Sequence, residues 1–275
     1  MLKLYYLEEA DSICSNRVLM TLAEKGIDDW IPQKLVLLNR DQFKPEYLKL
    51  NPKAQVPTLV HDGKVIRESS IICDYLDDLT PDPALKPKDP ADRAHLREWI
   101  KDSDESGYQA TASLNFVTKF RLEIPREKMV ERWKKVPDID RLHRQQSCVF
   151  EGLKSPYVLR AIGAWERTFK KMEETLSDGR PWIMGEQFTL VETTNAPFVK
   201  VLEMLRLLDI WLDDRPNVQR WWESITVRQS YKALEEYPGQ SEDDDAPHAK
   251  AGAAVANKIG ELLEHYRTTI PQYDR

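Results

Sequence analysis

Short apolar runs alternate with amphipathic segments over residues 1–80. Residues 3–7 and 33–38 are apolar runs of strand length, and residues 15–25 between them carry apolar side chains at helical spacing. We expect this helix to be capped by Gly26, because glycine readily adopts the backbone conformation at a helix C-terminus. A helix that joins two neighbouring strands predicts a right-handed parallel crossover.

The next apolar runs predict a hairpin. Residues 58–60 and 64–66 are short strand-like segments on either side of His61-Asp62-Gly63, and Asp-Gly favours a tight hairpin turn. An irregular helix is expected at residues 41–49, before the hairpin, and an amphipathic helix at residues 69–79, after it. The predicted order is therefore β-α-β-α-β-β-α.

Proline marks the end of this region. Residues 80–90 contain four prolines, which block helix continuation and predict a linker, and Asp89-Pro90 suits the start of a helix. Beyond it the pattern is helical, and the expected helices span residues 90–118, 126–135, 155–176, 190–209 and 216–228. We assign no element to residues 138–154, interpret residues 239–247 as an acidic loop, and expect a last helix at residues 248–266.

These elements predict four consecutive parts of the chain. An α/β domain occupies residues 1–80, a proline-rich linker residues 81–89, and an all-α domain residues 90–235. An acidic loop and a C-terminal helical extension follow at residues 236–275.

Composition narrows the class of partner. Charged residues make up 31% of the chain and the net charge is −6, which disfavours nucleic acid and anionic membranes as main partners. No apolar run has the length of a membrane span, and the N-terminal residues lack the pattern of a secretory signal. Cys14, Cys73 and Cys148 are widely spaced, and neither they nor the histidines show metal-ligand spacing. We therefore expect a reducing cytosol, no disulfides and no metal.

The first candidate site lies where the first helix begins, at Ser12-Ile13-Cys14-Ser15. Unpaired backbone N–H groups and the helix dipole stabilise a thiolate at such a position, and a serine hydroxyl adds a hydrogen bond. The plain alternative is that Ser12 only caps the helix and that Cys14 is a small buried apolar residue.

Two further sites accompany it. Pro57 directly precedes a strand, and a cis Val56–Pro57 bond would leave the Val56 N–H and C=O available to a peptide ligand; the alternative is an ordinary trans proline. Glu68 and Ser69 open a helix whose N–H groups suit a carboxylate, while Glu68 suits an ammonium group; the alternative is a simple capped helix. If the predicted β-α-β-α-β-β-α fold brings the three sites together, they form a pocket for a small peptide that carries a thiol. Glutathione has that shape.

These motifs resemble the glutathione transferase superfamily. The N-terminal resemblance rests on residues 51–59 (NPKAQVPTL) and 68–72 (ESSII). In the second domain, residues 182–192 (WIMGEQFTLVE) resemble the helix-start motif of the family, with Thr189 and Glu192 forming a capping box. Glu192 stands where aspartate is more usual. The resemblance also includes Arg215-Pro216-Asn217-Val218 with Trp221-Trp222, and it ends near residue 235.

The resemblance implies a fold and a set of roles. It implies a thioredoxin-like N-terminal domain that binds glutathione and an all-α domain that shapes the second-substrate pocket. Ser12 would activate the thiol, and Val56, next to Pro57, would bind the cysteinyl backbone. Glu68 and Ser69 would hold the γ-glutamyl end, and Lys53 would approach the glycine carboxylate.

The sequence Ser12-Ile13-Cys14-Ser15 also resembles the start of glutathione-dependent reductive dehalogenases of chlorinated hydroquinones. There, the residue matching Cys14 resolves a glutathionyl-aromatic adduct. Three hypotheses follow. The first is a glutathione transferase that acts on a small hydrophobic, aromatic electrophile. The second is a reductive dehalogenase or aryl-ether-cleaving lyase that uses Cys14, and the third is a non-catalytic binding protein on the same fold.

The resemblance also sets expectations for the rest of the molecule. Tyr5 and Tyr6 stand where other classes place an activating tyrosine, but here we assign them to the first strand. We expect Tyr108, Asn115 and Phe116 to line the second-substrate pocket, and we expect a cytoplasmic homodimer. The sequence names neither the electrophile, nor the dimer geometry, nor the role of residues 239–275.

Overall fold

The computed structural model describes residues 1–7, 12–36, 39–236 and 242–269. The strands are β1 (Leu2–Leu7), β2 (Trp30–Leu35), β3 (Thr58–His61) and β4 (Lys64–Arg67). The first helices are α1 (Ile13–Glu24), α2 (Pro45–Leu50) and α3 (Ser69–Leu79), with a 3₁₀ turn at Asp41–Phe43. This order confirms the predicted thioredoxin-like fold. The second strand begins at Trp30, earlier than expected, and its last two expected residues, 37–38, lie outside the described residues.

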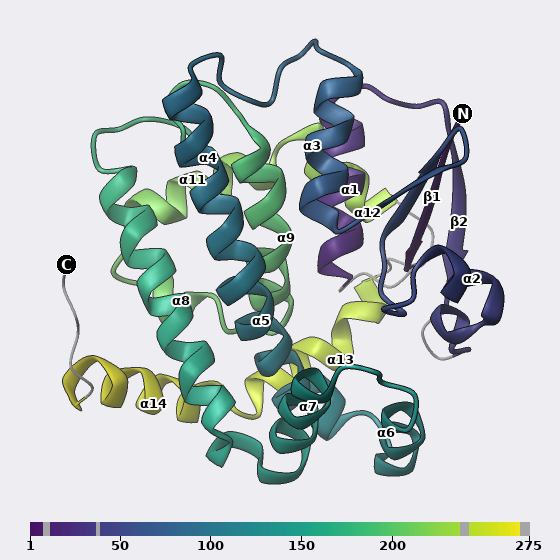
Figure 1. The fold of residues 1–275 in the computed structure, drawn as a ribbon. Coiled ribbons are helices and arrows are strands. Elements are labelled where there is room, and N and C mark those ends of the chain that lie inside the picture. The colour runs from purple at the N-terminus through teal and green to yellow at the C-terminus, as the bar shows by residue number, and fades with distance from the viewer. Residues whose placement is uncertain (8–11, 37–38, 237–241, 270–275) are drawn as a thin grey trace. The chain divides into compact units, whose positions relative to one another are not determined.

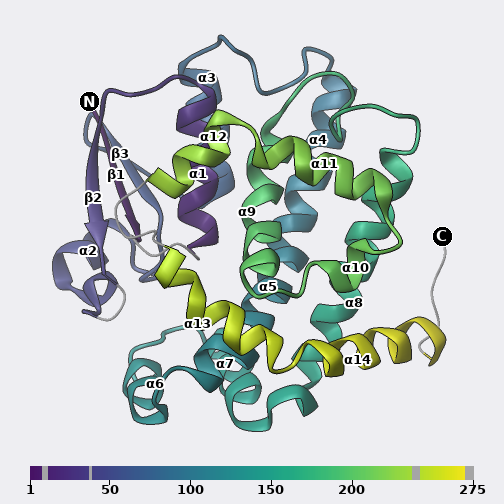
Figure 2. The same cartoon turned by 180° about the vertical axis from the view of Figure 1, so that it is seen from behind.

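The four strands form one mixed sheet in the order β2-β1-β3-β4. Strand β1 runs parallel to β2 and antiparallel to β3, and β3 pairs with β4 in a hairpin. The predicted Asp-Gly turn is confirmed. Asp62 and Gly63 have φ values of 48° and 80°, and this type of tight hairpin turn needs two residues with left-handed backbone conformation. Helices α1 and α3 cover one face of the sheet, and α2 lies toward the other (Figures 1 and 2).

The turn after α1 fixes the crossover to β2. Gly26 has a φ of 61°, its N–H donates to the carbonyl of Ala23, and the N–H of Ile27 donates to the carbonyl of Leu22. This is the Schellman arrangement that glycine favours beyond a helix end. The neighbouring Lys25 is buried and donates to the carboxylate of Asp77 at 2.7 Å, which joins the end of α1 to α3.

Helices form the remainder of the described chain. They are α4 (Pro90–Asp102), α5 (Tyr108–Asn115), α6 (Arg126–Trp133), α7 (Ile139–Glu151), α8 (Pro156–Thr175), α9 (Leu190–Met204), α10 (Asp209–Leu212), α11 (Pro216–Thr226), α12 (Gln229–Glu236), α13 (Glu242–Ala253) and α14 (Ala256–Thr269). Most expected helices are confirmed within a few residues. The unassigned residues 138–154 are mainly the helix α7.

The helix expected at residues 90–118 is not continuous. Two π-helical turns interrupt it, at Ser103–Gly107 and at Phe116–Phe120. The Ser103 hydroxyl lies 2.9 Å from the carbonyl oxygen of Trp99 and 2.8 Å from the side-chain oxygen of Asn195. A serine hydroxyl that bonds to a backbone carbonyl competes with regular helix bonding, and a hydrophobic pattern does not reveal this.

Three other helix predictions are corrected. The single helix expected at residues 248–266 is two helices, α13 and α14, separated at residues 254–255. The helix expected at residues 190–209 ends at Met204, and α10 begins only at Asp209. The acidic segment 239–247 was expected to be a loop, but α13 begins at Glu242; residues 239–241 lie outside the described residues. Acidic composition does not exclude a helix, because carboxylates interact favourably with the N-terminal end of the helix dipole.

Thr189 and Glu192 form the capping box that the sequence predicts. The Thr189 hydroxyl accepts the N–H of Val191 at 3.2 Å, and Glu192 accepts the N–H of Thr189 at 2.9 Å. The second carboxylate oxygen of Glu192 accepts the N–H of Ile183 at 2.9 Å, so this side chain also holds the segment before the helix. Burial raises the pKa of the Glu192 carboxyl, and the hydrogen bond from Ile183 opposes that shift.

The chain divides into two compact units. The first contains residues Met1–Ser103, Arg180–Phe198 and Arg220–Asp244, and the second contains Asp104–Gly179, Val199–Gln219 and Asp245–Arg275. In the first unit α1 packs against both α3 and α12, and in the second α8 packs against α5 and α14.

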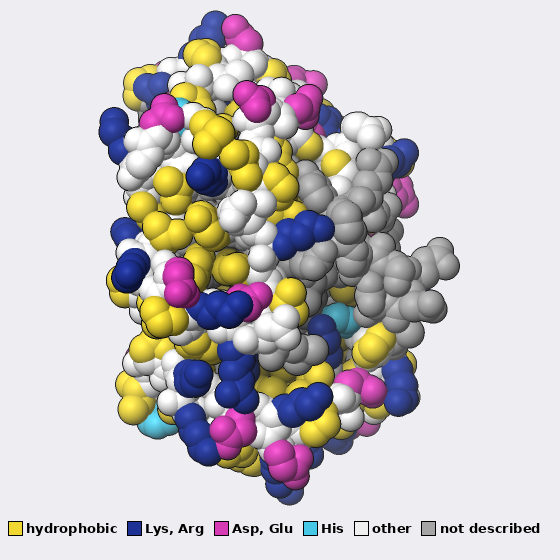
Figure 3. Space-filling view, turned by 90° about the vertical axis from the view of Figure 1, so that its right-hand side faces the viewer, with side chains coloured by type: hydrophobic (Ala, Val, Ile, Leu, Met, Phe, Trp, Pro, Cys, Tyr) yellow, Lys and Arg dark blue, Asp and Glu magenta, His cyan; other side chains and the backbone are white. Residues whose placement is uncertain are grey.

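The surface carries mixed charges. On the face shown in Figure 3, Lys and Arg side chains are interspersed with Asp and Glu, so no single sign of charge dominates it. Among the helices that the structure describes, none combines the length and the apolar character needed to cross a bilayer.

Candidate functional site

Ser12 stands immediately before α1, and its carbonyl accepts the N–H of Asn16 at 2.9 Å. Its side chain does not cap the helix. The Ser12 hydroxyl instead donates to the hydroxyl oxygen of Ser15 at 2.8 Å, and that oxygen also accepts the N–H of Leu7 at 3.2 Å. Ser12 is therefore held by a contact that links the end of β1 to the first turn of α1.

Cys14 lies in the first turn of α1 and is partly exposed, whereas Cys73 and Cys148 are buried. Cys14 is therefore less buried than the alternative interpretation, a small buried apolar residue, predicts. The first turn of α1 contains no acidic residue, so the positive end of this helix is not neutralised from within the turn. A thiolate at this position would be stabilised by the helix dipole.

The Val56–Pro57 peptide bond is cis, as the sequence interpretation required. Three polar residues support the loop before it. Tyr47 and Asn51 both donate to the carbonyl oxygen of Gln55, and both reach the buried hydroxyl of Thr58, at 2.9 and 3.1 Å. Burial raises the pKa of Tyr47 to about 12, so this phenol remains a hydrogen-bond donor at neutral pH.

Glu68 and Ser69 lie at the start of α3, as predicted. Glu68 has a φ of 66° and a ψ of 120°, a backbone conformation that is strained for a residue with a side chain. Ser69 is buried, and its hydroxyl oxygen accepts a hydrogen bond of 2.9 Å from Nη1 of Arg17. Arg17 comes from α1, is itself buried, and lies over the ring of Phe198 at 5.1 Å.

Lys53 and Glu68 form an ion pair of 2.6 Å. Their side chains are 65% and 52% exposed, so water screens the pair and its contribution to stability is about 0–1 kcal/mol. The resemblance implies a separate ligand group for each residue, the glycine carboxylate for Lys53 and the ammonium group for Glu68. In the described structure the two side chains satisfy each other.

The sheet register brings the three candidate sites together. Tyr5, near the end of β1, pairs with Thr58 at the start of β3, and Thr58 pairs with Arg67 at the end of β4. The segments that carry Ser12, Pro57 and Glu68 therefore meet at the same end of the sheet. This juxtaposition is a consequence of the β-α-β-α-β-β-α order, because each segment directly follows or precedes one of these strand ends.

Tyr5 and Tyr6 belong to β1, as expected. Tyr6 is buried with its ring edge-on to Trp30 at 6.0 Å, and Tyr5 lies 5.8 Å from the ring of Tyr47. Both side chains are accounted for by packing within the first unit.

The three residues expected to line the second-substrate pocket all lie in the second unit. Tyr108 opens α5 and is half-buried, whereas Asn115 and Phe116 are buried at its far end. The Phe116 ring stacks on Phe120 at 4.3 Å. Their contact with a second substrate stays a prediction.

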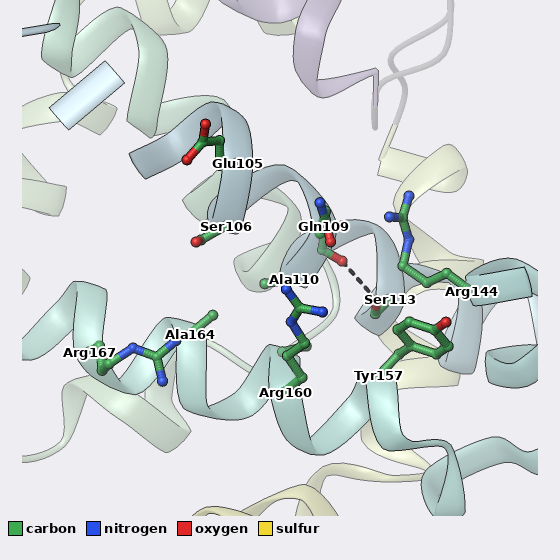
Figure 4. Close-up of a pocket in the computed structure, with 11 residues that line it drawn as sticks. Glu105, Ser106, Gln109, Ala110, Ser113, Arg144, Tyr157, Arg160, Ala164 and Arg167 are labelled. Atoms are coloured by element: carbon green, nitrogen blue, oxygen red, sulfur yellow. Dashed lines mark hydrogen bonds between the residues drawn. The ribbon is translucent and has the colours of Figure 1, made fainter. Parts of the chain in front are cut away.

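A pocket that no sequence pattern predicts lies within the second unit (Figure 4). It is open to solvent and lies between α5, α7, α8 and the turn Ser103–Gly107, and its volume of about 400 Å³ includes part of that solvent. Its walls include Arg144, Arg160 and Arg167. These arginines come from two helices and show no motif spacing along the sequence. Only the folded structure shows that they line the same pocket. Among the described residues, no group of three His, Cys, Asp or Glu side chains converges as metal ligands.

Comparison with known families identifies two matches along the chain. The family model of the glutathione S-transferase N-terminal domain matches residues 11–79, and that of the glutathione S-transferase C-terminal domain matches residues 141–229.

Individual relatives match over different lengths. Protein LigF of Sphingobium sp. (strain NBRC 103272 / SYK-6) is 44% identical over 94 residues, which are 33% of this chain and 36% of LigF. That match therefore spans only about a third of the relative's length. The tetrachloro-p-hydroquinone reductive dehalogenase of Sphingobium chlorophenolicum is 23% identical over 244 residues, 82% of this chain and 93% of that protein.

Solved structures agree with the fold. The crystal structure of the β-etherase LigF from Sphingobium sp. strain SYK-6 has a TM-score of 0.72 and 26% identity, and the match covers 86% of this chain and 98% of LigF. A glutathione transferase from Burkholderia graminis, solved with two glutathione molecules per subunit, has a TM-score of 0.65 and 24% identity, with 87% and 89% of the two chains covered.

Proposed function

The chain belongs to the glutathione transferase superfamily, and from that premise we propose that it is an enzyme that activates the thiol of glutathione. The thiolate sulfur forms a bond to a small, electrophilic, aromatic molecule, and the electron pair of the broken bond leaves with the displaced group. One observation carries this proposal. The segments that bear Ser12, the cis Val56–Pro57 bond and Ser69 meet at one end of the sheet.

The Ser12–Ser15 contact supports a mechanism of thiol activation. Before glutathione binds, the Ser12 hydroxyl donates to Ser15 at 2.8 Å. When the thiolate arrives, the Ser12 hydroxyl turns to it, and Ser15 donates its own proton to the Ser12 oxygen. Such a chain of hydrogen bonds strengthens each member. Lowering a thiol pKa from about 8.5 by about two units requires about 2.7 kcal/mol, shared between this chain and the dipole of α1.

The other polar contacts support recognition of the peptide. Because Arg17 donates to the Ser69 oxygen, the proton of that hydroxyl is free to bind the γ-glutamyl carboxylate. The ion pair between Lys53 and Glu68 opens, and its members bind the glycine carboxylate and the ammonium group. The N–H and C=O of Val56 pair with the cysteinyl backbone as an added strand would.

A second candidate reaction uses Cys14. Its partly exposed position in the first turn of α1 favours it, and so do the names of two relatives, a β-etherase and a reductive dehalogenase. In the dehalogenase form, the Cys14 thiolate attacks the sulfur of a glutathionyl-aromatic adduct. The arene leaves with the electron pair and takes a proton, and Cys14 is left in a mixed disulfide with glutathione. A second glutathione then reduces this disulfide and leaves as glutathione disulfide.

The test of the proposal is the pKa of bound glutathione. The thiolate absorbance of the complex is measured against pH for the wild type, Ser12→Ala, Cys14→Ala and the control Ser177→Ala, which removes an exposed hydroxyl of the second unit. We expect a depressed thiol pKa in the wild type and the control, and a value near that of free glutathione in Ser12→Ala. Failure of the wild type to bind glutathione would instead favour a non-catalytic binding protein.

The two reactions differ in their dependence on Cys14. For simple transfer, Ser12→Ala lowers kcat/KM at least about tenfold, which is about 1.4 kcal/mol of barrier, while Cys14→Ala keeps most activity. For the second reaction, Cys14→Ala stops after one turnover with a trapped glutathionyl adduct, which mass spectrometry detects. We also propose a cytosolic homodimer, and light scattering on the purified protein measures its mass.

A further inference from the structure

Arg17 joins three helices of the first unit. It belongs to α1, its Nη1 donates to the hydroxyl oxygen of Ser69 on α3 at 2.9 Å, and its guanidinium lies over the ring of Phe198 on α9, 5.1 Å from the ring centre. Helices α1 and α3 pack against each other (Figures 1 and 2), and Phe198 belongs to the same unit. Phe198 lies far beyond residues 11–79, which match the N-terminal family model. The contact of Arg17 with Ser69 therefore has a support that comes from the helical part of the chain.

Water is excluded from the contact between Arg17 and Phe198, which are 1% and 0% exposed. The face of an aromatic ring carries negative charge, and its attraction for a guanidinium is strongest where water does not compete. The ring restrains the guanidinium through its face and leaves Nη1 to donate to Ser69. Phe198 can therefore fix the direction in which Arg17 donates.

A second contact fixes α9 against α1. The hydroxyl oxygens of Thr21 on α1 and Thr193 on α9 lie 3.1 Å apart, and both residues are fully buried. The Thr21 hydroxyl also lies 2.8 Å from the carbonyl oxygen of Arg17. Thr21 therefore contacts both the backbone of Arg17 and the helix that carries Phe198, which fixes the ring relative to Arg17.

The orientation of Arg17 decides what the Ser69 hydroxyl can do. While Nη1 donates to the Ser69 oxygen, the proton of that hydroxyl points away from Arg17 and is directed to another acceptor. An arginine side chain is long and flexible, and without the ring it would sample other orientations. The Ser69 hydroxyl would then lose its fixed donor direction, and a ligand would have to order both side chains as it binds.

We propose that Phe198 is a positioning residue of the glutathione site, which acts through Arg17 on Ser69 and thereby sets the affinity for the γ-glutamyl carboxylate. This inference rests on the proposed function, because it takes Ser69 as the residue that binds this carboxylate. It adds that a fully buried residue of α9, outside the part of the chain that matches the N-terminal family model, controls glutathione binding.

The experiment measures the dissociation constant of glutathione by calorimetry and the pKa of the bound thiol by absorbance, on the full chain. Phe198→Leu keeps an apolar side chain and removes the ring. Phe198→pentafluorophenylalanine keeps the ring and reverses the charge of its face, so it decides the question if Phe198→Leu does not fold. Phe188→Leu is the control, because Phe188 lies in the same unit under another arginine, Arg228, at 3.8 Å, and Arg228 donates to Glu24 and not to Ser69. Melting curves show whether each variant is folded.

We expect both Phe198 variants to raise the dissociation constant of glutathione about threefold to tenfold, with the thiol pKa unchanged. Phe188→Leu should bind glutathione as the wild type does. In an Arg17→Met background, which lacks the guanidinium, Phe198→Leu should cause no further loss of affinity, because the ring acts only through Arg17.

The inference is overturned if folded Phe198 variants bind glutathione as tightly as the wild type, or if Phe198→Leu weakens binding by the same factor in the Arg17→Met background. A shift of the thiol pKa as large as that in Ser12→Ala would also overturn it. Failure of the wild type to bind glutathione would overturn the proposed function together with this inference, and that outcome is read from the wild type alone.

Discussion

The Ser12 hydroxyl donates a hydrogen bond of 2.8 Å to the hydroxyl of Ser15. Ser15 is fully buried and also accepts the N–H of Leu7, so its position is fixed from two sides. This contact holds the Ser12 side chain next to Ser15 before the ligand arrives, so Ser15 is in place to donate to the Ser12 oxygen once the Ser12 hydroxyl turns to the thiolate. We therefore regard Ser15 as a positioning residue that acts through Ser12.

Removing the Ser15 hydroxyl should impair thiol activation in a graded way. In Ser15→Ala the Ser12 hydroxyl loses its partner, and we expect the pKa of bound glutathione to rise by about half a unit to one unit. The rise should be smaller than in Ser12→Ala, and the pH profile of kcat/KM should shift with it. A merely structural role would lower the melting temperature but leave the pKa of bound glutathione at its wild-type value.

Arg17 should control glutathione affinity and not thiol activation. Its Nη1 holds the Ser69 hydroxyl at 2.9 Å, and Arg17→Lys keeps the charge but loses the planar donor geometry. We expect the dissociation constant of glutathione to rise at least about fivefold, which is about 1 kcal/mol, with an unchanged thiol pKa. Arg97→Lys, an exposed change on α4, is the control. A shift of the thiol pKa as large as that of Ser12→Ala would contradict this division of roles.

Glu192 should give the folded protein a specific pH dependence. Burial raises the pKa of this carboxyl above its ordinary value of 4.5, so the folded state binds the proton more tightly than the unfolded state. The associated stability is fully present below the ordinary value and is lost as pH rises through the raised pKa.

Glu192→Gln removes this titration and leaves one of the two backbone donors, Ile183 or Thr189, without an acceptor. We expect a loss of about 1–3 kcal/mol at low pH, and the difference from the wild type should shrink as pH rises. Urea unfolding at several pH values measures it, with Glu127→Gln, on the exposed side of α6, as the control. A difference that grows with pH would mean that the folded pKa is lowered.

Gly163 should be required for the docking of α14. A Cβ atom at this position would lie 2.3 Å from Cε2 of Tyr266, which is closer than any van der Waals contact allows. Gly163→Ala should therefore destabilise the protein by about 1–3 kcal/mol and expose α14 to proteolysis.

Gly260 offers a matched comparison, because it also lies in a helix and nothing lies within 4 Å of its added Cβ. Gly260→Ala should be neutral or stabilise by up to about 1 kcal/mol through helix propensity. Equal unfolding free energies for the two variants would show that the Tyr266 contact does not hold α14.

Local patterns were sufficient for several turns and caps of the first unit. Gly26, Asp62-Gly63 and the Thr189–Glu192 pair are each explained by backbone conformation or hydrogen bonding within a few residues, and each was predicted from sequence. The helix break after Asp102 was not predicted, because Ser103 there contacts Asn195, a residue that is distant along the chain.

The sequence by itself determined the order of strands and helices and, through that order, the sheet end that gathers Ser12, Pro57 and Ser69. This was possible because hydrophobic periodicity, turn residues and caps act over one or two turns of chain. Only the tertiary structure decided the contacts of Ser12 with Ser15 and of Arg17 with Ser69. The contact of Arg17 with Ser69 joins two helices, and such a contact depends on how helices pack, which no local pattern encodes.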